Sequence, residues 1–186
     1  MVPILALWLP ILLSAVFVFV LSSAIHMVFG YHANDLRKLP NEDGVADALR
    51  KFSIPDGTYG FPKPSSMKEW GTPAFQERVK KGPNAIMTIW SAGNPSMAGP
   101  MVAWFIYAVV IGVLAAYITG RAVGEGAHYL TVFRFAGATS FIAYALGGWQ
   151  DCIWWKRPVS TQIKNTFDAL LYALVTAGTF GWLWPR

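Results

Sequence analysis

The sequence is poor in cysteine and in charge. Cys152 is the only cysteine among 186 residues, so an internal disulfide is excluded and no cysteine pair exists for redox or metal chemistry. Charged residues make up 13% of the chain, about half their share in soluble proteins. The chain also lacks a glycine-rich phosphate loop before a helix and a nucleophile elbow. We therefore expect no catalytic residues of these standard types, and enzymatic activity stays an open question.

The few charges are concentrated in one part of the chain. Sixteen of the 25 charged residues lie between Asp35 and Lys81. The stretch 31–98 holds nine basic and seven acidic residues, a balance that does not suit a phosphate-binding surface. The net charge of +5 therefore predicts membrane orientation rather than a nucleic-acid partner.

The chain contains long apolar segments. A bilayer core about 30 Å thick requires roughly 20 apolar residues in helical form. Four segments meet this requirement, and they predict an all-α integral membrane protein with four transmembrane helices: Met1–Phe29, Gly99–Thr119, His128–Trp149 and Ile163–Trp184. The first has no preceding basic residue and a long apolar stretch, which indicates a retained helix rather than a cleaved signal peptide. The domain division follows as 1–29, 30–98 and 99–186.

Basic residues indicate how such a protein would be oriented. If all four segments cross, twelve of the fifteen Lys and Arg residues fall on the face that holds the loop 30–98. By the positive-inside rule that face is cytoplasmic. We therefore expect both termini outside and the loop 30–98 in the cytoplasm.

The loop of about 69 residues is expected to be partly structured. Asn41 followed by acidic residues predicts a helix start, and an apolar stripe continues to Phe52. Thr58–Phe61 and Ala85–Trp90 are typical of short strands, and Pro73–Lys81 of a short helix. Six prolines between residues 55 and 95 leave no room for a large core, so we expect a small cap on the membrane surface.

Two stripes of small residues predict close helix packing. Small residues at a spacing of four allow the backbones of membrane helices to approach each other. The stripes are Ala108, Gly112, Ala116 and Gly120 in the second span, and Ala169, Ala173, Ala177 and Gly181 in the fourth. They can pack inside a four-helix bundle, or at least one can face a partner subunit or a second copy of the chain.

The strongest group of polar residues follows the first helix. His26, His32 and Asp35 offer imidazole and carboxylate ligands that suit zinc or another transition metal. Gly30 permits a bend that would bring His32 back toward His26. Histidines that cap a helix end or meet lipid headgroups are the alternative interpretation. Haem ligation by two histidines of one chain is excluded if His128 lies across about 30 Å of hydrocarbon.

Arg134 and Asp168 are charges inside predicted spans. Intramembrane charges often mark functional sites. Both are expected to lie shallow and on opposite sides, so a direct ion pair between them is not predicted. Asp168 is instead expected to meet Lys164, one helical turn earlier.

Three stretches of the chain resemble a family of uncharacterised bacterial inner-membrane proteins. They are His26–Asp43, the turn Tyr59–Pro62, and Leu171–Pro185 with its Thr-Ala-Gly-Thr-Phe-Gly core. The family stretch that matches His26 also contains a histidine at the place of His32 and an acidic residue at that of Asp35. The resemblance implies a multi-pass protein of the bacterial inner membrane and carries no activity across.

Three functions remain open at this point. The first is a non-catalytic subunit or assembly factor of a larger membrane complex, based on the two small-residue stripes. The second is a membrane-bound metalloprotein using His26, His32 and Asp35. The third is a small transporter or channel that would have to self-assemble.

Overall fold

The structure is a computed structural model that describes residues 1–90, 93 and 96–186, and it divides into two units. The helical unit comprises Met1–Arg37 and Ser96–Arg186, and the hairpin unit comprises Lys38–Pro95. The predicted boundary at residue 29 therefore lies eight residues before the observed one. Residues 30–37 remain with the helical unit because their side chains contact the last helix.

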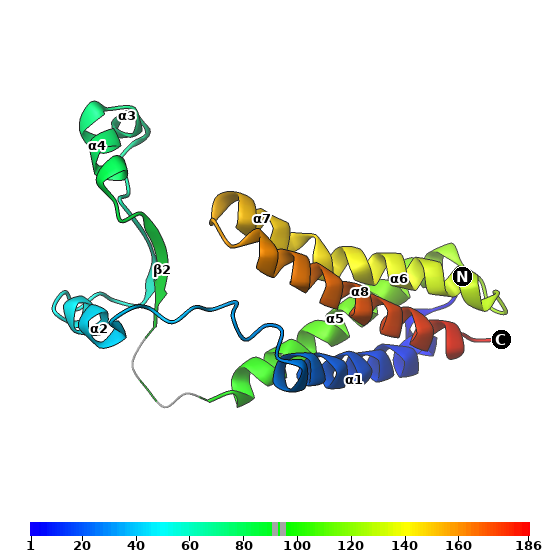
Figure 1. The fold of residues 1–186 in the computed structure, drawn as a ribbon. Helices are drawn as coiled ribbons and strands as arrows, with labels where there is room; N and C mark the ends of the chain where they lie inside the picture. The colour runs from blue at the N-terminus through cyan, green and yellow to red at the C-terminus, as the bar shows by residue number, and fades with distance from the viewer. Residues whose placement is uncertain (91–92, 94–95) are drawn as a thin grey trace. The chain divides into compact units, whose positions relative to one another are not determined.

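The helical unit is a bundle of four long helices. Each of α1, α5, α6 and α8 packs against two of the others, so the four form a closed ring of neighbours (Figure 1). The elements of this unit, in chain order, are η1 (Ile4–Leu7), α1 (Trp8–Ala24), the π-turn η2 (Ile25–Phe29), α5 (Ala98–Ala122), α6 (Tyr129–Ala145), α7 (Gly147–Trp154) and α8 (Val159–Trp182).

Three helical stretches of the described chain are long and apolar enough to cross a membrane. They are Ile4–Phe29, Ala98–Ala122 and Tyr129–Trp154. Many of their apolar side chains point outward, as expected of helices surrounded by lipid. The first three predicted spans correspond to these stretches.

The fourth predicted span, α8, does not meet the same criterion because it carries more polar residues. Four of those polar residues point into the bundle. Gln162, Asp168, Thr176 and Thr179 are all buried. The Gln162 amide donates to the Ala145 carbonyl at 3.3 Å, and the two threonine hydroxyls donate to carbonyls four residues earlier in α8. These buried polar side chains of α8 thus have hydrogen-bond partners inside the protein.

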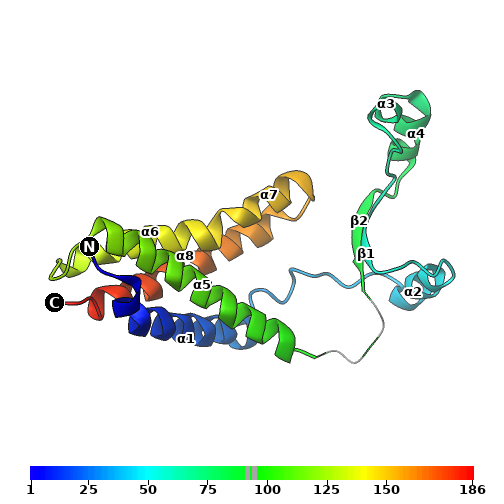
Figure 2. The same ribbon diagram turned by 180° about the vertical axis from the view of Figure 1, so that it is seen from behind.

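Backbone hydrogen bonds bring the chain ends together at one end of the bundle. The Val2 amide donates to the Gly120 carbonyl at 2.8 Å, and the Gly126 amide donates to the Pro185 carbonyl at 2.9 Å. The N-terminus, the α5–α6 connection and the C-terminus therefore lie at the same end, as Figure 2 shows. This is the arrangement expected of four consecutive antiparallel helices.

Both small-residue stripes are used inside the bundle. The stripe of α5 lies against the first helix: a Cβ added at Gly112 would come within 3.2 Å of the Ile11 carbonyl oxygen. The stripe of α8 lies against α6: a Cβ added at Gly181 would come within 2.6 Å of the Tyr129 ring. The alanines of both stripes are buried: Ala108, Ala116, Ala169, Ala173 and Ala177. The interpretation as internal packing accounts for both stripes.

The hairpin unit has short elements at the four predicted places and one further short helix, Met67–Trp70, that the sequence did not predict. Strands β1 and β2 pair antiparallel with Thr58 opposite Thr88, and the hydroxyls of these two threonines are 3.2 Å apart. Phe75 is buried beside Trp70 and forms a very small core. Asn41 precedes the first helix of the unit, although its side chain makes no capping hydrogen bond. The elements are α2 (Glu42–Arg50), β1 (Gly57–Phe61), α3 (Met67–Trp70), α4 (Pro73–Lys81) and β2 (Ala85–Ile89).

Gly120 is the position where the bundle tolerates a side chain least. A Cβ there would come within 2.6 Å of the Val2 carbonyl oxygen, so Gly120→Ala requires the backbones to separate. We expect this substitution to lower the free energy of unfolding by about 1–3 kcal/mol, the usual cost of overpacking. Gly99→Ala is the matched control, since a Cβ at this position of α5 meets nothing within 4 Å. Unfolding in mixed micelles measures both, and equal stability of the two variants would contradict this packing.

Candidate metal-binding site

The first helix ends in a π-turn that places His26. Helix α1 continues into η2, which ends at Gly30 with a left-handed backbone (φ +64°) that glycine adopts without strain. Single π-turns are frequent at functional sites. Nδ1 of His26 lies 2.9 Å from the Ser22 carbonyl oxygen. Since a carbonyl can only accept, this nitrogen carries the proton and Nε2 of a neutral ring has a free lone pair.

The turn after Gly30 brings His32 back onto His26. The Ala33 amide donates to the Gly30 carbonyl at 3.0 Å, and this tight turn reverses the chain. The two imidazole rings stack with centroids 4.6 Å apart and an interplanar angle of 11°. The bend that Gly30 permits is therefore present, and it joins two histidines that a regular helix would separate.

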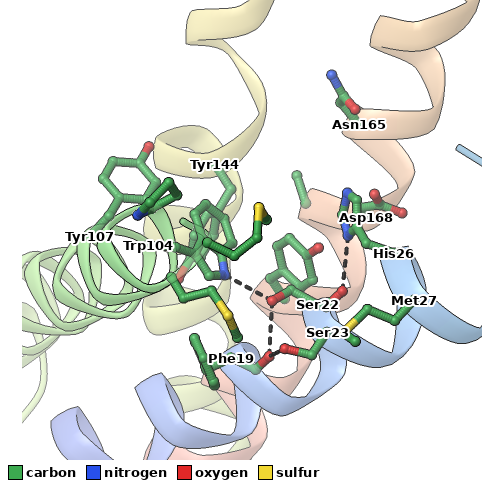
Figure 3. Close-up of a pocket in the computed structure, with 15 residues that line it drawn as sticks. Phe19, Ser22, Ser23, His26, Met27, Trp104, Tyr107, Tyr144, Asn165 and Asp168 are labelled. Atoms are coloured by element: carbon green, nitrogen blue, oxygen red, sulfur yellow. Dashed lines mark hydrogen bonds between the residues drawn. The ribbon is translucent and has the colours of Figure 1, made fainter. Parts of the chain in front are cut away.

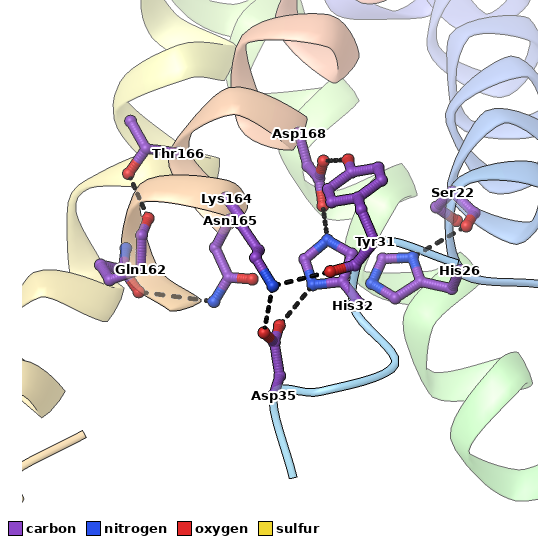
Figure 4. Close-up of polar contacts among 10 residues, drawn as sticks. All are labelled: Ser22, His26, Tyr31, His32, Asp35, Gln162, Lys164, Asn165, Thr166 and Asp168. Carbon is purple, nitrogen blue, oxygen red and sulfur yellow. Dashed lines mark hydrogen bonds and ion pairs between the residues drawn. The ribbon is translucent and has the colours of Figure 1, made fainter. Parts of the chain in front are cut away.

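His32 lies between two carboxylates. Its Nδ1 is 2.6 Å from Oδ2 of Asp35, and its Nε2 is 2.8 Å from Oδ2 of Asp168 (Figure 4). Asp168 belongs to α8, lies 136 residues after His32 and is only 3% exposed. One ring thus connects the segment after the first helix to the last helix of the bundle.

Lys164 and Tyr31 complete this network. The Lys164 ammonium donates to Asp35 at 2.6 Å and to the Tyr31 carbonyl at 2.7 Å. The Tyr31 hydroxyl donates to Oδ1 of Asp168. The expected pairing of Asp168 with Lys164 is wrong. Lys164 forms an ion pair with Asp35, and Asp168 instead contacts Tyr31 and His32. Sequence spacing within one helix could not show that the segment 31–35 would come between them.

The network also changes the acidity of two of its members. The Lys164 ammonium, which donates a hydrogen bond to Asp35, lowers the pKa of that carboxyl below its usual 3.8, and the hydrogen bond from His32 adds to this. Burial raises the pKa of the Tyr31 hydroxyl, and its hydrogen bond to Asp168 raises it further. Asp35 is therefore ionised and Tyr31 protonated at neutral pH.

The short contact between His32 and Asp168 requires a proton or a metal cation between the two side chains. With Nδ1 donating to Asp35, Nε2 of a neutral His32 presents a lone pair to a carboxylate oxygen only 2.8 Å away. A further proton, on the ring or on the Asp168 carboxyl, or a metal ion that both atoms bind can resolve this repulsion. The candidate ligand atoms of His26, His32 and Asp168 all lie within 4.8 Å of one another, which suits one shared cation.

The geometry changes the predicted ligand set by one residue. His26 and His32 belong to the set as predicted, but the carboxylate grouped with them is Asp168. Asp35 holds the opposite nitrogen of His32, where metal-binding histidines commonly have an orienting carboxylate. The signal for Asp168 was available, because it is a carboxylate within a predicted span.

A pocket of about 510 Å³ adjoins the candidate ligands His26 and Asp168 (Figure 3). It lies among α1, α5, α6 and α8, and most of its wall is aromatic side chains and methionines. The other lining residues are Phe19, Ser22, Ser23, Met27, Met97, Pro100, Met101, Trp104, Tyr107, Tyr144, Asn165, Ala169 and Tyr172.

The remaining candidates lie away from this cluster. His128 precedes α6 at the end that holds the chain termini, and its Nδ1 accepts from the Leu130 amide at 3.2 Å. Arg134 is exposed on α6 and borders a separate hollow with Ile118 and Phe135. Cys152 makes a long contact of 3.9 Å to the Pro158 carbonyl.

Comparisons of the chain with protein-family models, with curated proteins and with solved structures found no match.

The lowered pKa of Asp35 predicts how pH acts on the network. Because the folded pKa lies below 3.8, the ion pair with Lys164 stabilises the protein above that value and is lost as pH falls through the folded pKa. At pH 7 we expect Asp35→Asn to lower the free energy of unfolding by about 2 kcal/mol, the usual worth of a hydrogen bond to a charged group. Thermal unfolding in detergent measures the difference.

The same measurement at pH 3 completes the test. The difference between wild type and Asp35→Asn should shrink there, as the wild-type carboxyl begins to be protonated. Glu77→Gln, at an exposed position of α4, is the control and should change stability little at either pH. A difference for Asp35→Asn that is the same at both pH values would contradict the ion-pair account.

Proposed function

We propose that the protein is a membrane metalloprotein that binds one divalent first-row transition ion through His26, His32 and Asp168. The observation that carries the proposal is the 2.8 Å approach of His32 Nε2 to Asp168 Oδ2 while Nδ1 is held by Asp35. Two imidazoles and one carboxylate are a ligand set typical of zinc sites and of non-haem iron sites. Three protein ligands leave further coordination positions for water or a bound molecule.

The surroundings of the three ligands support this proposal. The Ser22 carbonyl orients His26, Asp35 orients His32, and the Tyr31 hydroxyl holds the second oxygen of Asp168. Such outer contacts fix the tautomer and direction of metal ligands. Asp35 and Asp168 bring two negative charges and Lys164 one positive charge, so the cluster favours an additional cation. His26 is exposed, which gives an ion a route to the site.

We also propose that all four long helices cross the membrane. Helix α8 runs between the same two ends as the three apolar helices, and its polar residues face inward, where lipid does not reach. The positive-inside rule then places Lys156, Arg157 and Lys164, together with the basic residues of loop 30–98, in the cytoplasm. The metal site would lie at the cytoplasmic end, with both termini outside, in a bacterial inner membrane.

An ion-pair network without metal is the competing explanation. A doubly protonated His32 between Asp35 and Asp168 would attach the segment 30–37 to α8 with no further role. The two other hypotheses, a non-catalytic subunit and a self-assembled transporter or channel, have less support. The stripes that suggested a partner subunit are packed against α1 and α6.

Metal content of the purified protein tests the proposal. The protein is prepared without a histidine tag, treated with chelator, loaded with Zn²⁺ or Co²⁺, and dialysed. We expect about one ion per chain in the wild type and less than about 0.1 in His26→Ala, His32→Ala and Asp168→Asn, since each removes one of three ligands. Asp35→Asn should keep the site but weaken its affinity about 10- to 100-fold, as loss of an orienting partner does.

His128→Ala is the matched control, because it removes the third histidine of the chain from the opposite end of the bundle. It should bind as much metal as the wild type. Equal metal content in the wild type and in the His26→Ala, His32→Ala double variant would reject the proposal in favour of the ion-pair network.

A further inference from the structure

The pocket beside the candidate metal ligands is lined by three kinds of side chain: aromatic rings, methionines and polar groups. Trp104, Tyr144 and Tyr172 pack with ring centroids 5.5–6.2 Å apart and form an aromatic wall. Methionines 27, 97 and 101 surround the pocket and are partly or largely exposed. The polar groups come from Ser22, Ser23, His26, Asn165 and Asp168. The volume of about 510 Å³ falls within the usual range for pockets that bind small molecules.

One fully buried polar atom in the described aromatic wall lacks a hydrogen-bond partner. Tyr172 lines the pocket and is 4% exposed, and its hydroxyl has no hydrogen bond to any described residue. Buried hydroxyls are normally satisfied, because leaving one unpaired costs free energy. Two neighbouring polar groups are already engaged: the Trp104 indole donates to Ser22 at 2.8 Å, and the Tyr107 hydroxyl donates to the Ala143 carbonyl at 3.2 Å. The Tyr172 hydroxyl is thus an unpaired donor in the wall of the pocket, covered by its neighbours in the absence of a ligand.

We propose that this pocket binds a membrane-soluble quinone or quinol. A flat ring suits the aromatic wall, where offset and edge-to-face contacts are favourable. The flexible methionines suit a prenyl or alkyl tail. One ring oxygen accepts the hydrogen bond from Tyr172, and the other meets the polar groups at the end formed by His26 and Asp168. A quinone or quinol combines these features, since it has oxygens on opposite sides of one ring and dissolves in the bilayer.

The binding of this ligand does not depend on the proposed metal. His32, which the metal requires, does not line the pocket, and Tyr172 is not a candidate metal ligand. His26 and Asp168 border both places, so a metal ion held there would lie beside the ring. The proposal concerns binding alone and includes no electron transfer.

Calorimetric titration of chelator-treated protein in nanodiscs with decylubiquinone tests the proposal. Heats of partition into empty nanodiscs are subtracted. We expect saturable binding to the wild type and an affinity about three- to tenfold weaker for Tyr172→Phe, which removes only the hydroxyl. Without ligand, Tyr172→Phe should unfold at the same or a higher temperature, because it deletes an unpaired buried group. If the hydroxyl had only a structural role, its removal would not lower the affinity for the ligand without also lowering the unfolding temperature.

Two controls separate this result from general lipophilic binding. Tyr117→Phe changes an exposed tyrosine of α5 outside the pocket and should leave the affinity unchanged. Decylbenzene has the ring and tail without the oxygens and should bind at least about tenfold more weakly. Equal affinity of the wild type and Tyr172→Phe, equal binding of decylbenzene, or no saturable binding would each overturn the proposal. Because metal is removed throughout, none of these outcomes bears on the metal site.

Discussion

Burial of the Asp168 carboxylate is the constraint on which the organisation of this end of the bundle depends. A carboxylate that is 3% exposed on a helix within an apolar bundle must have hydrogen-bond donors or a cation beside it. Tyr31 donates a hydrogen bond to it, and His32 lies 2.8 Å away, either as a doubly protonated ring or as a co-ligand of a cation; both residues belong to the segment that follows the first helix. The contacts of Asp168 with Tyr31 and His32 therefore hold residues 30–37 against α8. The chain reversal at Gly30 makes these contacts sterically possible.

The sequence predicted the local features more fully than the contacts between distant segments. Four short elements between residues 41 and 90, namely α2, β1, α4 and β2, lie within about two residues of their expected places, because prolines and residue alternation are local signals, whereas the short helix α3 was not predicted. The packing role of the small residues also followed from their spacing. The partner of His32 did not, since Asp168 is 136 residues away and helical periodicity does not tell which face of α8 meets which neighbour. Only the folded bundle decides that Lys164 pairs with Asp35.

The proposed metal site and the proposed ligand pocket both depend on α8. Its polar face points inward, which puts Asp168 and Tyr172, four residues apart, on the same side of one helix. Asp168 meets the histidines at the end of the bundle, and Tyr172 lies deeper in the aromatic wall. In the account proposed here, a cytoplasmic ion reaches the site through the exposed His26, and a bilayer-soluble ring enters beside the methionines. One helix would thus present a water-accessible site and a lipid-accessible site next to each other.

X-ray absorption at the zinc edge of the zinc-loaded wild type tests the central claim most directly, because it reports the ligand atoms themselves. The account predicts a first shell of nitrogen and oxygen at about 2.0–2.1 Å with outer scattering from two imidazole rings and no sulfur. In Asp168→Asn the metal would be lost or its shell rebuilt. A first shell of water oxygens without imidazole scattering in the wild type would contradict the claim and leave His32 as the centre of an ion-pair network.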